Sequence, residues 1–154
     1  MSDASPARPA SASIHANAVV VGETGVLIRG ASGSGKSELA HALVGEAQRR
    51  GLFARLVGDD RIRLVVVGAR LAARPHPLIA GMLERRGIGI VAVEHEPAAI
   101  LRIVVDLDAG LERMPEETSQ IAELHGVKLP RLHLAIGQPV LEQARRILDR
   151  VEVI

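Results

Sequence analysis

Short apolar runs dominate the start of the chain and lead into a segment with helical spacing. Runs at 18–21 and 26–29 flank Gly22-Glu23-Thr24-Gly25, a pattern that predicts a β-hairpin with a short turn. A helix is predicted next, because apolar residues recur at positions 39, 40, 43, 44 and 47 and Arg49-Arg50-Gly51 is typical of a helix end. The strand before this helix therefore has an antiparallel neighbour, unlike the strands of a doubly wound parallel sheet.

The rest of the chain predicts further strands and a second helix. Strands are expected at 53–57, 62–67, 70–72, 85–91, 100–107 and 132–136. A short helix is expected from Leu78 to Leu83, ending at Glu84, whereas residues 111–126 give no clear pattern. Pro139 suits the first residue of a helix with the apolar stripe Val140, Leu141, Ala144, Ile147, Leu148 and Val151. Two helices and about seven to nine strands predict an α/β fold, a mixed and largely antiparallel sheet with packed helices.

The segment between the hairpin and the first helix matches the phosphate-binding pattern G-x-x-x-x-G-K-[ST]. It reads Gly30-Ala31-Ser32-Gly33-Ser34-Gly35-Lys36-Ser37. Glycines 33 and 35 allow backbone conformations that a Cβ forbids, so successive N–H groups can converge on phosphate oxygens. Lys36 is expected to reach the β- and γ-phosphates and the Ser37 hydroxyl to bind Mg²⁺, while the helix N-terminus favours negative charge. This loop predicts a nucleotide site, with ATP and Mg²⁺ as its ligands.

Phosphoryl transfer also needs a carboxylate near the metal and a group that accepts a proton. Asp59-Asp60 follows the strand after the first helix and is expected at the phosphate end of the sheet, although a solvated turn is the alternative. Glu84 with Arg86 is a second candidate, with a surface ion pair as its alternative. Asp106 follows an apolar run as a Walker B carboxylate does, and is a competing metal ligand.

Composition narrows the classes of function. The chain has 154 residues, a formal charge of +1, no cysteine and a single aromatic residue, Phe53. Its length predicts one domain, expected at residues 14–154, with residues 1–13 as a disordered lead-in that lacks the features of a secretory signal. The lack of cysteine excludes disulfides and zinc–thiolate sites and agrees with a cytoplasmic protein. Neither nucleic-acid nor membrane binding is expected, because stacking aromatics, a basic block and an apolar run of about 20 residues are all missing.

The order of the motifs resembles a known family. The chain contains, in sequence, His15, the loop 30–37 with Glu38 directly after it, Arg50-Gly51, Asp59-Asp60 and Glu84-Arg85-Arg86-Gly87-Ile88-Gly89-Ile90. This combination resembles the catalytic domain of HPr kinase/phosphorylase, whose signature E-x-R-G-x-G-I matches residues 84–90, and in particular the short members that lack the N-terminal domain. The resemblance implies the family's mixed-sheet phosphate-loop fold, which is shared with phosphoenolpyruvate carboxykinases.

The resemblance also implies roles at the nucleotide. Lys36 contacts the β- and γ-phosphates, and Ser37 and Glu84 hold Mg²⁺. The rest of the signature, Arg86, Gly87 and Gly89, supports that glutamate.

At the acceptor, the resemblance makes Asp60, or failing it Asp59, the base that takes the proton from a serine hydroxyl. His15 assists this base. Arg113, in Glu112-Arg113-Met114, stabilises charge on the transferred phosphoryl group.

The resemblance implies ATP-dependent phosphorylation of a serine in HPr, the small phosphocarrier of the sugar phosphotransferase system, by a homo-oligomer that is hexameric in the family. Reverse phosphorolysis of phosphoseryl-HPr stays open, because the family's later loop P-x-x-P-G-R-N is replaced here by Ala135-Ile136-Gly137-Gln138-Pro139. Two alternatives also stay open. One is a conventional small-molecule kinase with Asp106 as its Walker B residue, and the other is a nucleotide-binding regulator without catalytic activity.

Overall fold

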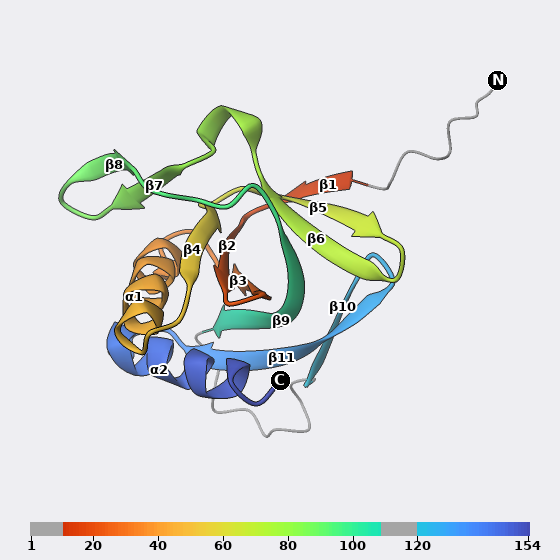
Figure 1. Cartoon of the computed structure of the whole chain (residues 1–154). Helices are drawn as coiled ribbons and strands as arrows, with labels where there is room; N and C mark the ends of the chain where they lie inside the picture. The colour runs from red at the N-terminus through yellow and green to blue at the C-terminus, as the bar shows by residue number, and fades with distance from the viewer. Residues whose placement is uncertain (1–10, 109–119) are drawn as a thin grey trace.

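The computed structural model describes residues 11–108 and 120–154 and has two helices on one face of a curved sheet (Figure 1). The helices are α1 (Lys36–Arg49) and α2 (Val140–Val151), which pack against each other. The described strands are β1 (Ser11–Ile14), β2 (Ala16–Val21), β3 (Thr24–Arg29), β4 (Ala54–Gly58), β5 (Ile62–Val67), β6 (Arg70–Pro75), β7 (Met82–Arg85), β8 (Gly89–Ala92), β9 (Ala99–Asp108), β10 (Ile121–Leu124) and β11 (Val127–Ala135).

Nine of these strands form one sheet around β9. The order is β1-β5-β6-β9-β3-β2-β4, and β11 joins the C-terminal part of β9, with β10 as its antiparallel partner. Strand β9 runs parallel to β3 and to β11, whereas the other described pairs of this sheet are antiparallel. The mixed, largely antiparallel sheet expected from the sequence is confirmed, although the described residues contain eleven strands in all, more than were expected.

The central strands are buried on both faces, which explains their continuous apolar runs. Alternate residues such as Val19, Val26 and Ile28 face the helices, where they pack with Leu39, Leu43 and the apolar stripe of α2. The residues between them face a second core, enclosed where the sheet curves over itself and built from Ala18, Leu27, Leu64, Leu71, Val104 and Leu129, among others. The two cores fix β2, β3 and β9 rigidly, and the phosphate-binding pattern begins at the end of β3.

Glycines mark both ends of α1. Gly35 precedes the helix with φ of +101°, and Gly51 follows it with φ of +80°, both in the left-handed region that favours glycine. The amide of Leu52 donates to the carbonyl of Ala47 and so closes the last turn. The predicted hairpin and first helix are confirmed as β2–β3 and α1.

The prediction for residues 78–91 was wrong. Instead of a helix over 78–83, one turn of 3₁₀-helix (Pro77–Ile79) is followed by the separate hairpin β7–β8. The chain leaves the helical conformation at Ala80, and Gly81, with φ of +78°, prevents a helix from continuing to residue 83. Gly87, in the turn at 86–88, and Gly89, the first residue of β8, also have positive φ, so the predicted single strand at 85–91 is the end of β7, a tight turn and β8.

The expected disordered lead-in is also corrected at its end. Residues 11–13 belong to β1, which pairs with β5 from Ser11–Val65 to Ile14–Ile62, and the structure does not describe residues 1–10. At the other end, α2 begins at Val140, one residue after the predicted start, with Pro139 as its N-cap. No helix within residues 11–108 and 120–154 has the length and hydropathy needed to cross a bilayer.

Candidate functional site

The loop between β3 and α1 has the shape of an anion cradle. Gly33 and Gly35 have φ of +82° and +101°, and the amide of Ser34 donates to the carbonyl of Ala31 over 3.0 Å. Gly30 lies so close to Leu107 and Ser34 that an added Cβ would come within 2.5 Å of the Ser34 Oγ. Because side chains are missing at these points, the loop backbone is free to face a phosphate group.

Lys36 is the first residue of α1 and is 6% exposed. Its Nζ donates to the carbonyl of Gly30 over 3.0 Å and to that of Ala31 over 3.4 Å. The ammonium group is therefore held against the inside of the loop, where it would meet phosphate oxygens.

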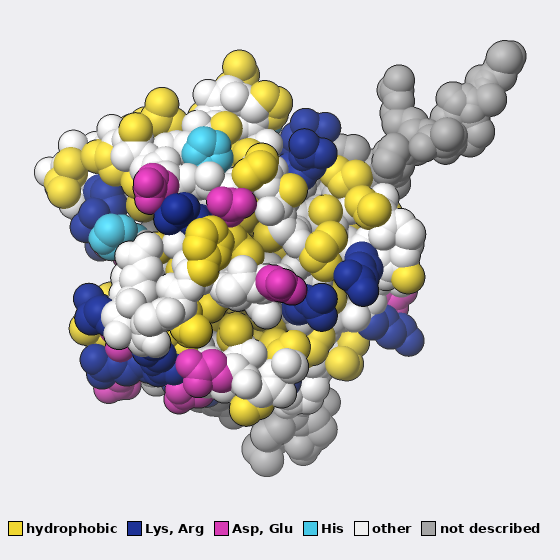
Figure 2. All heavy atoms as spheres, in the orientation of Figure 1, with side chains coloured by type: hydrophobic (Ala, Val, Ile, Leu, Met, Phe, Trp, Pro, Cys, Tyr) yellow, Lys and Arg dark blue, Asp and Glu magenta, His cyan; other side chains and the backbone are white. Residues whose placement is uncertain are grey.

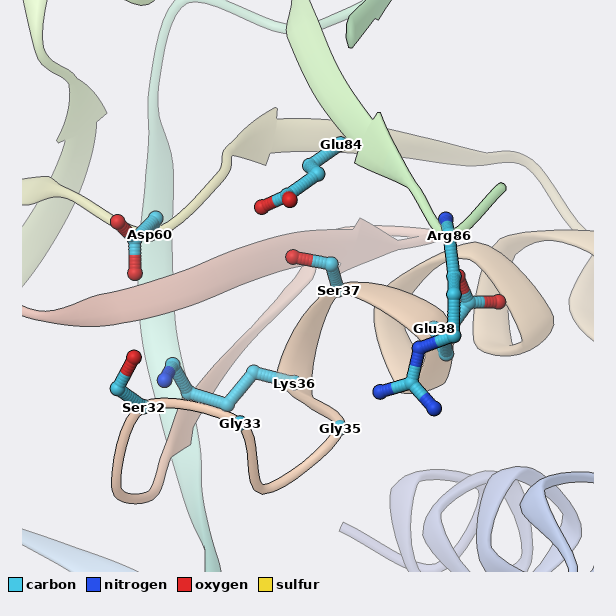
Figure 3. Close-up of a pocket in the computed structure, with 9 residues that line it drawn as sticks. All are labelled: Ser32, Gly33, Gly35, Lys36, Ser37, Glu38, Asp60, Glu84 and Arg86. Atoms are coloured by element: carbon cyan, nitrogen blue, oxygen red, sulfur yellow. The ribbon is translucent and has the colours of Figure 1, made fainter. Parts of the chain in front are cut away.

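A cavity of about 320 Å³ opens above this loop (Figure 3). The loop and the start of α1 contribute Ser32, Gly33, Gly35, Lys36, Ser37 and Glu38 to its lining. Asp60, Glu84 and Arg86 come from other segments of the chain. The structure thus brings the two candidate motifs at 59–60 and 84–86 to the phosphate loop, as the sequence predicted. The roles of these residues in a reaction stay predictions.

Asp59 connects three parts of the site. Its buried carboxylate accepts hydrogen bonds from the Ser37 hydroxyl at 2.6 Å, from the side-chain amide of Asn17 and, at 3.2 Å, from the backbone amide of Glu84. The acid therefore joins α1, β2 and β7 and holds the hydroxyl expected to bind the metal.

Asp60 differs from its neighbour in both exposure and conformation. Its side chain is exposed and lines the cavity, and its φ of +66° lies in the left-handed region, where Asp is found more often than most residues. The backbone amide of Asp60 donates to the Asn17 Oδ1 over 3.0 Å. Of the two acids, only Asp60 is free of side-chain hydrogen bonds to the described residues and open to an incoming group.

Glu84 and Arg86 reach the cavity from the hairpin β7–β8. The hairpin is fixed over α1 because the amide of Glu84 donates to Asp59 and the amide of Arg86 donates to Glu38 over 3.1 Å. In Figure 3 the Glu84 carboxylate points toward the space beside Ser37, whereas the Arg86 guanidinium extends along Glu38. The oxygen atoms of Ser37 and Glu84 are suitable ligands for Mg²⁺.

The site fits a magnesium ion bound together with a nucleotide. Among the described residues, no group of three or more His, Cys, Asp or Glu side chains could hold a metal by itself. Magnesium is usually bound by one or two carboxylates and by substrate phosphates, which agrees with Glu84 and Ser37 beside a phosphate loop.

Other predicted residues lie outside the cavity. His15 is exposed at the bend between β1 and β2 and does not line the cavity. Gly87 lies in the hairpin turn, and Gly89 begins β8. Arg113 falls outside the described residues.

Asp106 does not line the cavity and forms ion pairs with two arginines. Its carboxylate binds Arg29 through two hydrogen bonds of 2.8 and 2.9 Å, and Arg131 through a third of 2.6 Å. Burial alone would raise the pKa of Asp106, but the hydrogen bonds and charge of Arg29 and then of Arg131 outweigh this and lower it. The geometry therefore favours Asp106 as the anchor that joins β3, β9 and β11 over its use as a Walker B ligand.

The Asp106→Asn variant is expected to lose about 2 kcal/mol of unfolding free energy at pH 7, because two partly buried guanidinium groups lose their counter-ion. Since the pKa of Asp106 is lower in the folded state, its stabilising effect is complete above the unfolded-state pKa of about 3.9 and is lost as the pH falls through the folded-state pKa. Urea unfolding should therefore show a difference from the parent protein that shrinks below about pH 4. The exposed Asp149→Asn is the control, and a constant difference from pH 7 to pH 3 would contradict the assignment.

Sequence reasoning missed Asn17 and Arg29. A fully buried asparagine inside an apolar strand is the signal that could have drawn attention to Asn17, but its partners at 59 and 60 are 42 and 43 residues away. Arg29 is followed directly by the phosphate loop, and only its pairing with Asp106, 77 residues away, shows its role.

The chain is similar to known proteins over most of its length. The model of the HPr Serine kinase C-terminal domain matches residues 8–147. The HPr kinase/phosphorylase of Neisseria meningitidis serogroup B is 36% identical over 133 residues, covering 75% of this chain and 39% of that protein. The corresponding protein of Streptococcus thermophilus is 34% identical over 137 residues, covering 80% of this chain and 42% of that protein.

A solved structure shows the same fold. The HPr(Ser) kinase/phosphatase from Coxiella burnetii superposes with a TM-score of 0.71 at 26% sequence identity, covering 92% of this chain and 98% of that chain. The chain thus spans less than half the length of these curated relatives but nearly all of the solved structure. The resemblance inferred from the motifs is confirmed, and the chain belongs to the family of HPr serine kinase C-terminal domains.

Proposed function

We propose that this protein transfers the γ-phosphoryl group of ATP to a serine hydroxyl of HPr in a magnesium-dependent reaction. The observation that carries the proposal is the single cavity in which a phosphate loop, a lysine, an exposed aspartate and a glutamate meet. The names of the relatives supply the acceptor, since they are HPr kinases.

Each side chain has a part in this reaction. Lys36 and the loop amides hold the β- and γ-phosphates, and Ser37 and Glu84 would hold the magnesium ion, which supplies charge neutralisation. Asp60 accepts the proton as the serine oxygen forms its bond to the γ-phosphorus and the bond to the bridging oxygen of ADP breaks. Asp59 stays fixed by its hydrogen bonds and keeps Ser37 in place. His15 as an assistant to the base and Arg113 as a stabiliser of charge stay predictions, as does a homo-oligomer.

A protein acceptor is favoured by the surface beside Asp60. A second hollow of about 170 Å³ is lined by Asp59, Asp60, Leu83 and Glu84 together with Ile79, Met82 and Ile90. Figure 2 shows hydrophobic side chains exposed over the hairpin β7–β8, where Ile88 and Ile90 are 67% and 73% exposed. An apolar surface that continues from a catalytic aspartate suits contact with another protein better than with a small polar substrate.

A second candidate is the reverse activity, removal of the phosphate from phosphoseryl-HPr. The names of the relatives include phosphorylase and phosphatase. Residues 135–139, however, contain no arginine that could bind a second phosphate group.

The test is to incubate the protein with Mg-ATP and purified HPr and to map the product by mass spectrometry. We expect one phosphate on a serine of HPr, and none when that serine is replaced by alanine or when magnesium is removed with a chelator. ADP formation without phosphoserine on HPr would contradict the proposed acceptor.

The Glu84→Gln variant is expected to need at least about 10-fold more Mg²⁺ for half-maximal activity, because a neutral amide is a weaker ligand for a hard cation. Titration of activity with Mg²⁺ at fixed ATP measures this. Glu94→Gln is the matched control, because Glu94 is 80% exposed at its side chain and pairs with Arg55 away from the cavity. An unchanged Mg²⁺ requirement in Glu84→Gln would remove Glu84 from the metal site.

A further inference from the structure

Asn17 is the one fully buried polar side chain among the described core residues, and neither the motifs nor the comparisons assign it a role. It lies on β2 between Ala16 and Ala18, opposite Ile28 of β3. A buried amide costs free energy unless its donor and acceptor are both satisfied. Its hydrogen bonds therefore show what it does in this position.

Both bonds of Asn17 go to the acidic pair. Its Nδ2 donates to the Asp59 Oδ1, and its Oδ1 accepts from the backbone amide of Asp60 over 3.0 Å. The orientation of the amide is determined by these partners, because the flipped group would place an oxygen against a carboxylate and an NH₂ against an N–H.

The position of Asn17 in the sheet explains this geometry. Backbone pairing of β4 with β2 ends at Gly58, which pairs with Ala18. Beyond that point the side chain of Asn17 continues the hydrogen bonding in place of the backbone and holds the amide of Asp60. The chain then turns sharply, with φ of +66° at Asp60 and a bond from the amide of Arg61 to the carbonyl of Asp59 of 2.7 Å, before β5 begins.

We propose that Asn17 is a positioning residue that sets the conformation of Asp60 and links it to Ser37 and Glu84 through Asp59. This inference rests on the proposed kinase function for its effect on rate. The Asn17–Asp59 bond fixes one carboxylate between the phosphate loop and the hairpin, and the Asn17–Asp60 bond fixes the turn that carries the base. One buried amide therefore determines the distance between the proton acceptor and the groups that hold the nucleotide and the metal.

The rate effect is tested with Asn17→Leu, which keeps the number and branching of the side-chain heavy atoms and removes both hydrogen bonds. We expect kcat for phosphorylation of HPr to fall about 10- to 100-fold, as a small misplacement of a catalytic group does, while the Kd for ATP changes less than twofold. Val19→Ala on the same strand is the matched control, since it removes buried apolar volume without touching the acids and should lower Tm but not kcat measured well below Tm.

Exchange of the amide and the carboxylate between residues 17 and 59 provides a second test. Asn17→Asp places two carboxylates in contact and should lose at least as much kcat as Asn17→Leu, whereas Asn17→Asp combined with Asp59→Asn restores a donor opposite an acceptor and should recover part of it. Asn17 is not a positioning residue if Asn17→Leu retains kcat within twofold, or if its entire loss appears as weaker ATP binding.

Amide hydrogen exchange at Asp60 tests the positioning without any turnover. The amide should be protected in the parent protein and exchange at least tenfold faster in Asn17→Leu, with protection of β2 and β9 retained. If the parent protein fails to phosphorylate HPr but shows this exchange difference, the proposed function fails and the positioning role stands. Equal exchange in the two proteins would overturn the positioning role whatever the activity.

Discussion

Replacement of Lys36 by alanine is expected to lower phosphoryl transfer at least about 10³-fold while leaving the fold intact. The ammonium group is held at the inner surface of the phosphate loop by the carbonyls of Gly30 and Ala31, where it would neutralise charge that grows on the phosphate oxygens. Alanine is a good helix former and Lys36 is the first residue of α1, so the helix should persist. Initial rates with Mg-ATP and HPr, together with circular dichroism, measure the two effects.

The chain provides a direct control for this experiment. Its second lysine, Lys128, is exposed on β11 and does not line the cavity, so Lys128→Ala should keep the parent rate. Retained activity in Lys36→Ala would remove the loop from the mechanism, whereas equal losses in both variants would indicate a general effect of charge.

The second large effect is expected for Asp60→Asn, which should lower kcat about 10²- to 10⁴-fold because the amide cannot accept the serine proton. Binding of ATP should change little, since the phosphates are held by the loop and by Lys36. Asparagine also tolerates a positive φ, so the turn at residue 60 is preserved. Single-turnover transfer and equilibrium binding of ATP, measured on the same preparations, separate chemistry from affinity.

Asp106→Asn distinguishes this mechanism from a conventional kinase. If Asp60 is the base, Asp106→Asn should keep most of the transfer rate at a temperature well below its lowered Tm, because Asp106 binds two arginines outside the cavity. The reverse result, a severe loss in Asp106→Asn and a mild one in Asp60→Asn, would favour a Walker B role for Asp106.

Local signals in the sequence predicted the phosphate loop, the β2–β3 hairpin and both helices. The loop is a contiguous motif whose glycines carry their own backbone requirement, and α1 and α2 have apolar stripes that need no distant partner. The proximity of Asp59-Asp60 to this loop was predicted from the order of the elements, and that of Glu84 from the family resemblance; both agree with the cavity lining and hydrogen bonds.

Features that depend on distant partners could not be predicted. Strand β1 has a weak apolar pattern in Ser11-Ala12-Ser13 and becomes a strand because β5, about fifty residues later, pairs with it. Leu78 to Leu83 looked helical, but the positive φ of Gly81 and the pairing of β7 with β8 decide otherwise.

The same reason explains what the sequence left undecided at the site. Asp59 and Asp60 are equivalent candidates in the sequence. In the structure the Asp59 carboxylate accepts hydrogen bonds from Asn17, Ser37 and Glu84, whereas Asp60 faces the cavity. Asp106 looks like a Walker B residue until Arg29 and Arg131 are placed beside it.

A single-turnover reaction with γ-labelled ATP tests the claim that one cavity joins the nucleotide to a protein serine through Asp60. Excess enzyme is mixed with labelled Mg-ATP and HPr, and the label on serine is followed over time in the parent protein and in Asp60→Asn. We expect rapid transfer of label to one serine of HPr in the parent protein and almost none in Asp60→Asn, with ATP bound equally by both. Equal transfer by both proteins, or label released only as inorganic phosphate, would contradict the claim.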